Sequence, residues 1–476
     1  MQQKYTPKPG DKIFRPARYR ARPWRILLPA IPRPRISGSS SLVLIYGFAG
    51  LIACGTILLI LPISTKTGQL TSIVDALFTA TSAVCVTGLV VVDTADYWSL
   101  FGQIVILVLI QAGGFGFMTS ATVFLLAFGR RIGLQERLLI RESMGLAQLG
   151  GLVKIVKRMA VFTLVAEVIG AAIFYLHFST QYSPGTALQV SLFQSISAFN
   201  NAGFDLFGSF RSLSNYQGVS LVVLPTAALI FIGGISFLVI SDIAKSRARS
   251  WGRLSLDSKM VLTTTAALLA LGIIIILLTE WNNPDTLGAM SQPQRLLNAF
   301  FQSVTARTAG FSTINMANVA DYTLFFTMLL MFVGGASGST AGGIKINTFG
   351  MLVATIWSTI RGRERAGAFG RQFNTQQIHR ALTLVMFSIG LVSLVVFILT
   401  VTEEFRFLNL LFETVSAFGT VGLSTGITPD LSIAGRLIIT GTMFIGRLGP
   451  LTLALALIQR QQPTAYRYPE EAVRIG

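Results

Sequence analysis

Four copies of one short phrase constrain this chain more than any other feature. Each copy runs from a Phe through three residues to Ser or Thr and then Ala, and it ends at a glycine 9 or 10 residues after the Phe. The copies begin at Phe78, Phe193, Phe301 and Phe412 and end at Gly88, Gly203, Gly310 and Gly422, with successive glycines 115, 107 and 112 residues apart. A near-constant period indicates a repeated structural unit. Each copy is an apolar stretch too short to cross a bilayer that ends where glycine lets the backbone turn, which predicts a half-membrane helix followed by an extended loop.

Composition places these repeats in a membrane. The chain is 52% hydrophobic and 12% charged, and its mean hydropathy is +0.64. Such a chain cannot hide its apolar surface in a water-soluble fold. The net charge of +18 would suggest a nucleic-acid partner on a globular surface, but most basic residues lie between apolar runs, so we expect none. Two cysteines exclude a disulfide framework, and two histidines offer no metal-ligand cluster.

Eight apolar runs are long enough to cross the bilayer, and one motif lies within each successive pair. The runs are Leu42–Leu61, Leu100–Phe128, Met159–His177, Val219–Ile240, Met260–Leu278, Leu324–Trp357, Leu382–Val401 and Ile433–Leu457. Because two crossings return the chain to its starting side, the units are parallel copies related by an axis along the membrane normal. The predicted fold is an all-α membrane protein with four parallel repeats of helix, pore helix and helix, in a pseudo-fourfold arrangement around one central pore.

This pattern divides the chain into six parts. They are a basic N-terminal arm at 1–41, repeat 1 at 42–128, repeat 2 at 159–242, repeat 3 at 259–357 with an irregular loop at 334–345, repeat 4 at 380–458, and a tail at 459–476. The arm has ten basic residues, six prolines and one acid. It is typical of a disordered segment or one that lies on anionic membrane lipids, and an organelle transit peptide is an alternative.

The basic residues predict the orientation. Thirty of the 38 Lys and Arg residues lie in the arm, in the links between repeats, or in the tail. The positive-inside rule therefore predicts a multi-pass protein of the plasma membrane with both termini in the cytoplasm and all four motifs opening outward.

The loops at the ends of the motifs suit a cation. Irregular backbone is tolerated in a bilayer only where it is buried in protein or lines a wet cavity, and four loops around one axis meet that condition. Each short helix would direct the partial negative charge of its C-terminus toward the axis, where backbone carbonyls could replace the hydration shell of an ion. The four loops (Val84–Leu89, Phe199–Phe204, Arg307–Phe311, Phe418–Leu423) contain no acid, which argues against a site for divalent ions.

The sequences TSAVCVTGLVVVDT, SISAFNNAGFDLF, SVTARTAGFSTIN and SAFGTVGLSTG resemble the four pore loops of the Trk/Ktr/HKT superfamily of potassium transporters, and most closely the membrane subunit of bacterial Ktr systems. The likeness covers about residues 42–458. This likeness extends to the third loop, which is one residue shorter than the others and contains Arg307. It implies a K⁺ selectivity filter made of Val86, Thr87, Gly88, Asn201, Ala202, Gly203, Thr308, Ala309, Gly310, Thr420, Val421 and Gly422. Since serine at the first glycine position favours sodium in relatives, Gly88 points to potassium.

The same resemblance implies further properties. They are a homodimer of membrane subunits, a separate cytoplasmic ring that binds ATP or ADP and regulates transport, and Na⁺ as an activator or coupling ion of a sodium-dependent system. No cofactor is expected in the chain itself. A sodium-permeable or Na⁺/K⁺-symporting relative is the alternative. A polytopic membrane enzyme is a remote one, because the few polar residues within the membrane spans form no catalytic set.

Two features within the expected spans stand out. The run Leu324–Trp357 is interrupted by Gly334, Gly335, Ala336, Ser337, Gly338, Ser339, Thr340, Ala341, Gly342, Gly343, Ile344 and Lys345. A phosphate-binding loop is disfavoured, because Lys345 follows Ile344 and no strand precedes the stretch. The resemblance implies an intramembrane gating loop.

The second feature is Arg447, in an otherwise apolar run. We expect it to face the pore and the 334–345 loop, or else to pair with backbone carbonyls as a structural residue. For Glu167 the sequence leaves two interpretations: a coupling-ion site, or a hydrogen bond between helices.

Overall fold

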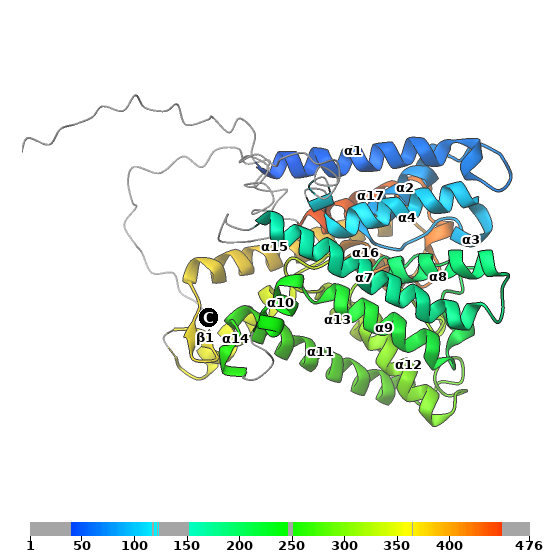
Figure 1. The fold of residues 1–476 in the computed structure, drawn as a ribbon. Coiled ribbons are helices and arrows are strands. Elements are labelled where there is room, and N and C mark those ends of the chain that lie inside the picture. Colours follow the sequence, from blue (N-terminus) through cyan, green and yellow to red (C-terminus); the bar gives the residue numbers. More distant parts are fainter. Residues whose placement is uncertain are drawn as a thin grey trace, which may run out of the picture. The chain divides into compact units, whose positions relative to one another are not determined.

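The computed structural model describes residues 40–116, 119–120, 122, 152–245, 251–363 and 365–449. The chain divides into two units, Met1–Gly38 and Ser39–Gly476, and every described residue belongs to the second. Helices make up nearly all the regular structure among these residues (Figure 1). One two-residue hairpin, β1 (Gly367–Ala368) paired antiparallel with β2 (Arg371–Gln372), lies between α14 and α15.

Four long helices have the length and composition to cross a membrane. They are α1 (Ser40–Ile60), α7 (Leu152–Phe178), α11 (Leu256–Glu280) and α15 (Thr375–Thr402). Only 22–33% of the residues in their most apolar stretches are buried. Because so much apolar surface would be costly in water, these faces fit contact with lipid.

The four motifs lie at the ends of four shorter helices. These are α2 (Ile73–Cys85), α8 (Pro184–Phe199), α12 (Gln292–Thr305) and α16 (Phe407–Gly419). At 13–16 residues, each helix is roughly 20–24 Å long, which is less than the hydrocarbon thickness of a bilayer. Their start signals are local: Ser183 caps α8 ahead of Pro184, and Ser291 forms a capping box with Gln294 at the start of α12. The short helices predicted at the motifs are therefore present, and their half-membrane depth stays a prediction.

The helices that follow the motifs differ from the prediction. They are α4 (Leu100–Phe115), α9 (Ser220–Gly234) with α10 (Phe237–Lys245), α13 (Asp321–Phe332) with α14 (Ile346–Ile360), and α17 (Ile433–Leu448). The expected span Val219–Ile240 is bent within its length, since α9 and α10 meet at 89°. In Leu324–Trp357 the expected interruption separates α13 from α14. The ends of the expected spans Leu100–Phe128 and Ile433–Leu457 lie outside the described residues.

Glycines near the ends of three of these helices allow close packing against the short helices. A Cβ on Gly113 of α4 would lie 1.9 Å from the carbonyl oxygen of Val84, and one on Gly233 of α9 would lie 1.9 Å from that of Phe199. A Cβ on Gly446 of α17 would lie 2.1 Å from the carbonyl oxygen of Phe418. Each helix therefore packs its backbone directly against the end of a short helix, at a place where no side chain fits.

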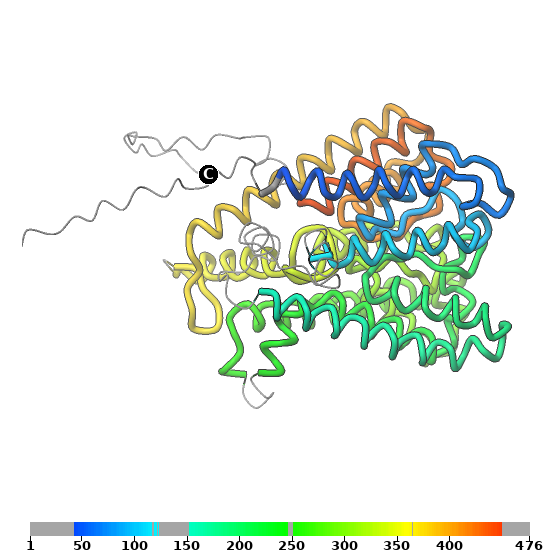
Figure 2. Tube along the Cα trace, turned by 45° about the horizontal axis from the view of Figure 1, so that its top comes forward, coloured from blue at the N-terminus to red at the C-terminus, as the bar shows by residue number. Residues whose placement is uncertain are grey.

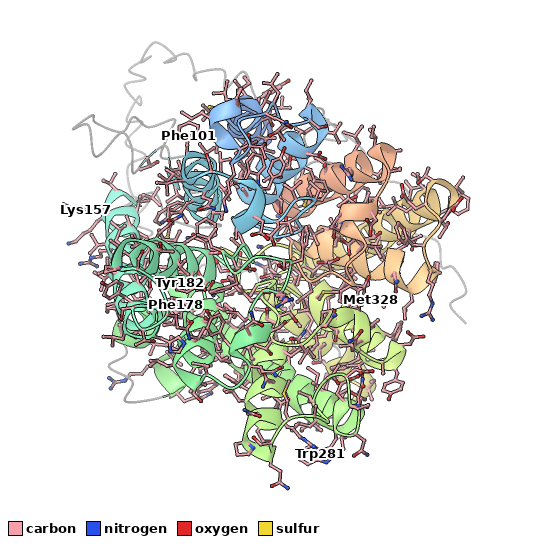
Figure 3. The ribbon with its side chains drawn as sticks, turned by 90° about the vertical axis from the view of Figure 1, so that its right-hand side faces the viewer. Phe101, Lys157, Phe178, Tyr182, Trp281 and Met328 are labelled. Atoms are coloured by element: carbon pink, nitrogen blue, oxygen red, sulfur yellow. The ribbon has the colours of Figure 1, made fainter. Side chains whose placement is uncertain are left out.

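Contacts between elements run in a closed order. Helix α4 packs on α8, α9 on α12, α13 on α16, and α17 on α2. The last described helix thus returns to the first motif helix, and Figure 2 shows the orange and red C-terminal helices beside the blue α1. Figure 3 views the helices nearly end-on, with their colours following one another around the middle of this unit. The labelled Phe178 and Tyr182 belong to a cluster of rings at the end of α7, where their centroids are 6.2 Å apart.

Two buried carboxylates accept hydrogen bonds at the N-termini of the helices that follow the third and fourth motifs. Glu280, at the end of α11, accepts hydrogen bonds from the Ala320 backbone N–H (3.1 Å) and the Thr323 hydroxyl (2.6 Å) at the start of α13. Glu403, after α15, accepts the backbone N–H and the hydroxyl of Ser432 at the start of α17. These bonds satisfy groups that a helix N-terminus leaves unpaired.

Candidate ion-conduction site

Each short helix is followed within three residues by a residue with left-handed backbone. These residues are Val86, Asn201, Thr308 and Thr420, with φ of 56°, 57°, 70° and 50°. In the first loop the Thr87 N–H donates to the Ser82 carbonyl (2.8 Å) and the Val86 N–H to the Ala83 carbonyl (3.1 Å), which is a Schellman ending. The second and fourth loops have the same pair of bonds. The third loop lacks one residue, and there the Ala309 N–H reaches the Thr305 carbonyl instead.

The glycine two residues later is also left-handed. Gly88, Gly203, Gly310 and Gly422 have φ of 88°, 72°, 80° and 94°, and the residue between each glycine and the left-handed helix end has negative φ. Left-handed backbone therefore recurs at every second residue here, a conformation that glycine adopts readily. Left-handed backbone costs about 1–3 kcal/mol at a residue other than glycine, and Val86 is β-branched, so the surrounding contacts must hold this conformation.

The four motif glycines form a closed ring of neighbours. A Cβ built on Gly88 would lie 2.9 Å from Cα of Gly203, one on Gly203 would lie 3.1 Å from Cα of Gly310, and one on Gly310 would lie 3.1 Å from Cα of Gly422. One on Gly422 would lie 3.1 Å from Cα of Gly88. The carbonyl oxygens of Ala202, Ala309, Val421 and Thr87 take part in the same contacts. Main chain therefore surrounds this point on four sides, and a side chain at any of the four positions would collide with it.

The hydroxyl of each motif holds its loop, in one of two ways. Ser82 and Ser416 accept the N–H of Gly88 (3.0 Å) and Gly422 (3.1 Å). Ser197 and Thr305 instead donate to the carbonyls of Phe204 and Phe311, both at 2.6 Å. Either bond ties the residues around the glycine to the short helix. The Arg307 guanidinium turns away from the ring and donates to the Thr265 hydroxyl of α11 (3.5 Å).

A cavity of about 710 Å³ opens on one side of the glycine ring. All four glycines line it, together with residues that follow them in sequence, including Leu89, Phe204, Ser312 and Leu423. Asp93 and Asp205 also line the cavity. Loss of contact with water raises the pKa of Asp205 to about 6, and a hydrogen bond from the Phe207 N–H opposes that rise. Acidic groups at the mouth of a pore attract cations.

The 334–345 segment lies on the other side, against residues that precede the glycines. A Cβ on Gly342 would meet the Thr420 hydroxyl at 2.0 Å, and one on Gly334 would lie 3.3 Å from the Thr308 methyl. The Thr340 hydroxyl donates to the Gly233 carbonyl (3.1 Å) and approaches the Asn201 amide oxygen (3.5 Å). The segment therefore touches three of the four left-handed helix ends.

Arg447 joins this segment to another helix. Its guanidinium donates to the Thr340 carbonyl of the segment and to the Gly113 carbonyl at the end of α4. Lys345, in the same segment, donates to the Ala341 carbonyl. The expected contact between Arg447 and the 334–345 loop is present, and it is made through backbone carbonyls. Its expected orientation toward a pore stays a prediction.

Glu167 lies in a network between three helices. Its carboxylate accepts hydrogen bonds from the amides of Gln111 on α4 (3.4 Å) and Asn200 at the end of α8 (3.1 Å), and the Ser195 hydroxyl donates to its backbone carbonyl (2.6 Å). This arrangement favours the hydrogen bond between helices over a coupling-ion site.

Comparisons with known proteins agree with this geometry. Residues 41–467 match the family model TrkH, described as a cation transport protein. The chain belongs to the TrkH family of cation transport proteins. It is 42% identical to the Ktr system potassium uptake protein B of Bacillus subtilis (strain 168), over 91% of this chain and 96% of that protein. It is 39% identical to the potassium/sodium uptake protein NtpJ of Enterococcus hirae, over 90% and 96%.

A solved structure shows the same fold. The potassium transporter TrkH from Vibrio parahaemolyticus superposes with a TM-score of 0.70 at 19% identity, covering 91% of this chain and 87% of that one. The resemblance noted from the pore loops is therefore confirmed at the level of the TrkH family. The family consists of cation transporters, so the chain is a multi-pass membrane protein and not an enzyme.

Several residues of the site were missed by reasoning from the motifs. Three of them are glycines that pack against carbonyl oxygens at the ends of the short helices, near the ends of the helices after the motifs: Gly113, Gly233 and Gly446. Their signal was a glycine pair or a Gly-Arg-Leu-Gly stretch at a similar distance beyond each motif. Glu413, next to the Phe of the fourth motif, was also passed over.

Proposed function

We propose that this chain is the pore-forming subunit of a potassium uptake system of the Ktr type. In this proposal its four units surround one axis with pseudo-fourfold symmetry, each with a membrane helix, a pore helix and a second helix. A dehydrated K⁺ is coordinated at the axis by backbone carbonyls of the four loops. The observation that carries the proposal is the closed ring of Gly88, Gly203, Gly310 and Gly422, with the carbonyl of each preceding residue beside a neighbouring glycine.

The chemistry of the ring favours K⁺ over a divalent cation. The filter residues supply carbonyl oxygens, and the loops between the helix ends and the glycines contain no carboxylate. Neutral dipoles can replace the hydration shell of K⁺, whereas Ca²⁺ and Mg²⁺ sites use carboxylates. The C-termini of the four short helices add partial negative charge at the same place.

Gating is assigned to the segment 334–345 and to Arg447. The segment contacts the filter on the side away from the cavity, and Arg447 fixes it to α4. Movement of this segment would open or close the path below the filter while the glycine ring stays in place. The cavity then faces the outside, the links between repeats face the cytoplasm, and both termini are cytoplasmic, in line with the positive-inside rule.

The proposal includes partners. The relatives named as Ktr system proteins indicate a system with more than one component. We assign to this chain a homodimer of membrane subunits and a separate cytoplasmic ring that binds ATP or ADP. The name of the NtpJ relative includes both ions, and a sodium-permeable or Na⁺/K⁺-symporting activity is the second candidate function.

Growth rescue tests the proposal. A bacterium that lacks its own potassium uptake systems would be supplied with this chain and grown at limiting potassium, with and without sodium and with and without a co-expressed nucleotide-binding subunit. Rescue at low potassium that requires the chain supports K⁺ uptake. Rescue that fails in all four conditions, although the protein is found in the membrane, would refute it. Sodium influx that matches rubidium influx would favour the second candidate.

A further inference from the structure

Glu413 is a carboxylate that the filter and the gate do not use. It lies on α16, directly after the Phe of the fourth motif, and its side chain is fully buried. Its Oε1 accepts a hydrogen bond from the Thr428 hydroxyl, while its Oε2 has no hydrogen-bond partner among the described residues. A buried carboxylate oxygen without a partner is costly, so this atom calls for a proton, a water or a cation.

Two hydroxyl groups connect this carboxylate to the cavity. Ser424 and Thr428 follow the fourth filter glycine, and their hydroxyl oxygens are 3.0 Å apart. The Thr428 hydroxyl donates to the Glu413 carboxylate, and Ser424 is joined to this group through Thr428. Both residues also line the cavity that contains the four filter glycines. An ion in this cavity can therefore reach the hydroxyl groups as well as the filter glycines.

The equivalent positions in the other motifs are neutral. They are Thr79, Gln194 and Gln302, and the amide of Gln302 donates to the sulfur of Met316 (2.9 Å) while that of Gln194 donates to Thr226 (3.4 Å). The side-chain oxygens of these three residues also lack a hydrogen-bond partner among the described residues, so Glu413 differs from them by its charge. The nearby Arg436 is occupied by Asp75 and by the carbonyls of Pro429 and Leu431. Neither ion pair formed among the described residues includes Glu413.

We propose that Glu413, Ser424 and Thr428 form a binding site for Na⁺, separate from the filter and entered from the cavity. A carboxylate and two hydroxyls are hard oxygen ligands, and one negative charge balances one monovalent cation. A divalent ion would need more acidic ligands, and no group of three His, Cys, Asp or Glu side chains occurs in the described part of the chain. Na⁺ is smaller than K⁺ and gains more from direct contact with a carboxylate.

Occupation of this site would affect the filter through the backbone. Ser424 and Thr428 belong to the segment that leaves Gly422, and Glu413 belongs to the helix that ends before it. A bound Na⁺ would therefore fasten both ends of the fourth filter loop to one another. This effect on flux rests on the proposed function, whereas the binding of Na⁺ does not.

Thermal unfolding of the purified full-length protein tests the binding. Wild type would be measured in choline buffer with added Na⁺ or K⁺, beside Glu413→Gln, which places here the residue found in the second and third motifs. Glu280→Gln is the matched control, because Glu280 is equally buried but its carboxylate has donors for both oxygens. A ligand that binds only the folded state raises the unfolding temperature. We expect Na⁺ to raise it for wild type and for Glu280→Gln, and not for Glu413→Gln.

Three results would overturn the site. They are a wild-type protein with no Na⁺ response, a Glu413→Gln variant that keeps the full response, or a K⁺ response that is lost in Glu413→Gln to the same extent. A lower unfolding temperature in Glu413→Gln with the Na⁺ response retained would show a protonated, structural carboxyl group.

Flux provides the second measurement. In proteoliposomes, external Na⁺ should stimulate rubidium uptake several-fold for wild type and for Ser432→Ala, whose hydroxyl contacts a different buried acid, Glu403. Uptake by Glu413→Gln should no longer depend on Na⁺. If wild type takes up no rubidium at all, the proposed function fails, but the unfolding measurements still decide whether the sodium site exists.

Discussion

The glycine ring and the 334–345 segment both depend on glycine, but for different reasons. In the ring every glycine is left-handed and lies against main chain of the neighbouring loop, and each loop is bonded to its own helix end. In the segment only Gly338 and Gly343 are left-handed. Its hydrogen bonds to the rest of the molecule run from Ala336 and Thr340 to the end of α9, and from Thr340 to Asn201. Others join Gly338 to Ser236, Ser337 to Asn347 and Thr340 to Arg447. The ring is held by close main-chain contacts on four sides and the segment by single hydrogen bonds, several of them to side chains. We would expect this difference between the proposed fixed filter and the proposed movable gate.

The ring should tolerate substitution least. Gly88→Ser places a Cβ 2.4 Å from the Ala202 carbonyl oxygen and forces a left-handed backbone on serine. The conformational cost alone is about 1–2 kcal/mol, and displacing the carbonyl adds to it. Since 1.4 kcal/mol corresponds to about a factor of ten, we expect the preference for rubidium over sodium to fall at least about tenfold. Paired flux measurements of the two ions check this.

Gly50→Ser is the matched control for the ring. Gly50 lies on α1 with nothing within 4 Å of its Cβ position. This variant should keep the selectivity of wild type. A Gly88→Ser variant that remains as selective as wild type would contradict the assignment of Gly88 to the filter.

The second-largest effect is expected from removing the hydrogen bonds of Arg447, which hold the 334–345 segment. Arg447→Ala removes the donors to the Thr340 and Gly113 carbonyls, and hydrogen bonds to a charged group contribute about 1.5–3 kcal/mol each. With the segment released, we expect rubidium flux in the absence of any regulator to rise by up to about tenfold, while the protein still inserts. Unchanged uptake kinetics would show that the arginine has no part in gating. Arg447→Lys keeps the charge but cannot span both carbonyls, and it should give an intermediate flux.

The contact between the two regions can be tested by itself. Gly342→Ala places a methyl group 2.0 Å from the Thr420 hydroxyl oxygen and 3.0 Å from the Thr420 Cβ. The hydroxyl can rotate away, but the Thr420 Cβ cannot move as easily. We expect flux to change by a few-fold with little change in selectivity, because the segment shifts and the ring does not. A large loss of selectivity would mean that the segment supports the filter. Gly441→Ala, with nothing within 4 Å, is the control.

Sequence reasoning reached the ring but not its surroundings. The spacing from Phe to glycine predicted the short helices and the meeting of the four glycines, because both follow from local helix length and backbone freedom. It did not predict that Val86, Asn201, Thr308 and Thr420 would be the left-handed helix ends, since their side chains disfavour that backbone and only tertiary contacts enforce it. The break between α9 and α10 was missed for a similar reason. An apolar run with two glycines reads as one span until the close approach of the Phe199 carbonyl is known.

The smallest effect is expected at Glu167. Its two amide partners, Gln111 and Asn200, link α4, α7 and the end of α8, and Asn200 precedes the filter residue Asn201. Glu167→Gln keeps the shape, and its single amide oxygen can still accept one of the two hydrogen bonds. Rubidium flux should therefore change by no more than about twofold, the equivalent of roughly 0.4 kcal/mol. Its sodium dependence should not change, in contrast to that of Glu413→Gln. A Glu167→Gln variant whose flux no longer responds to sodium would instead make this network a coupling-ion site, and the ring would then depend on a charge outside the cavity.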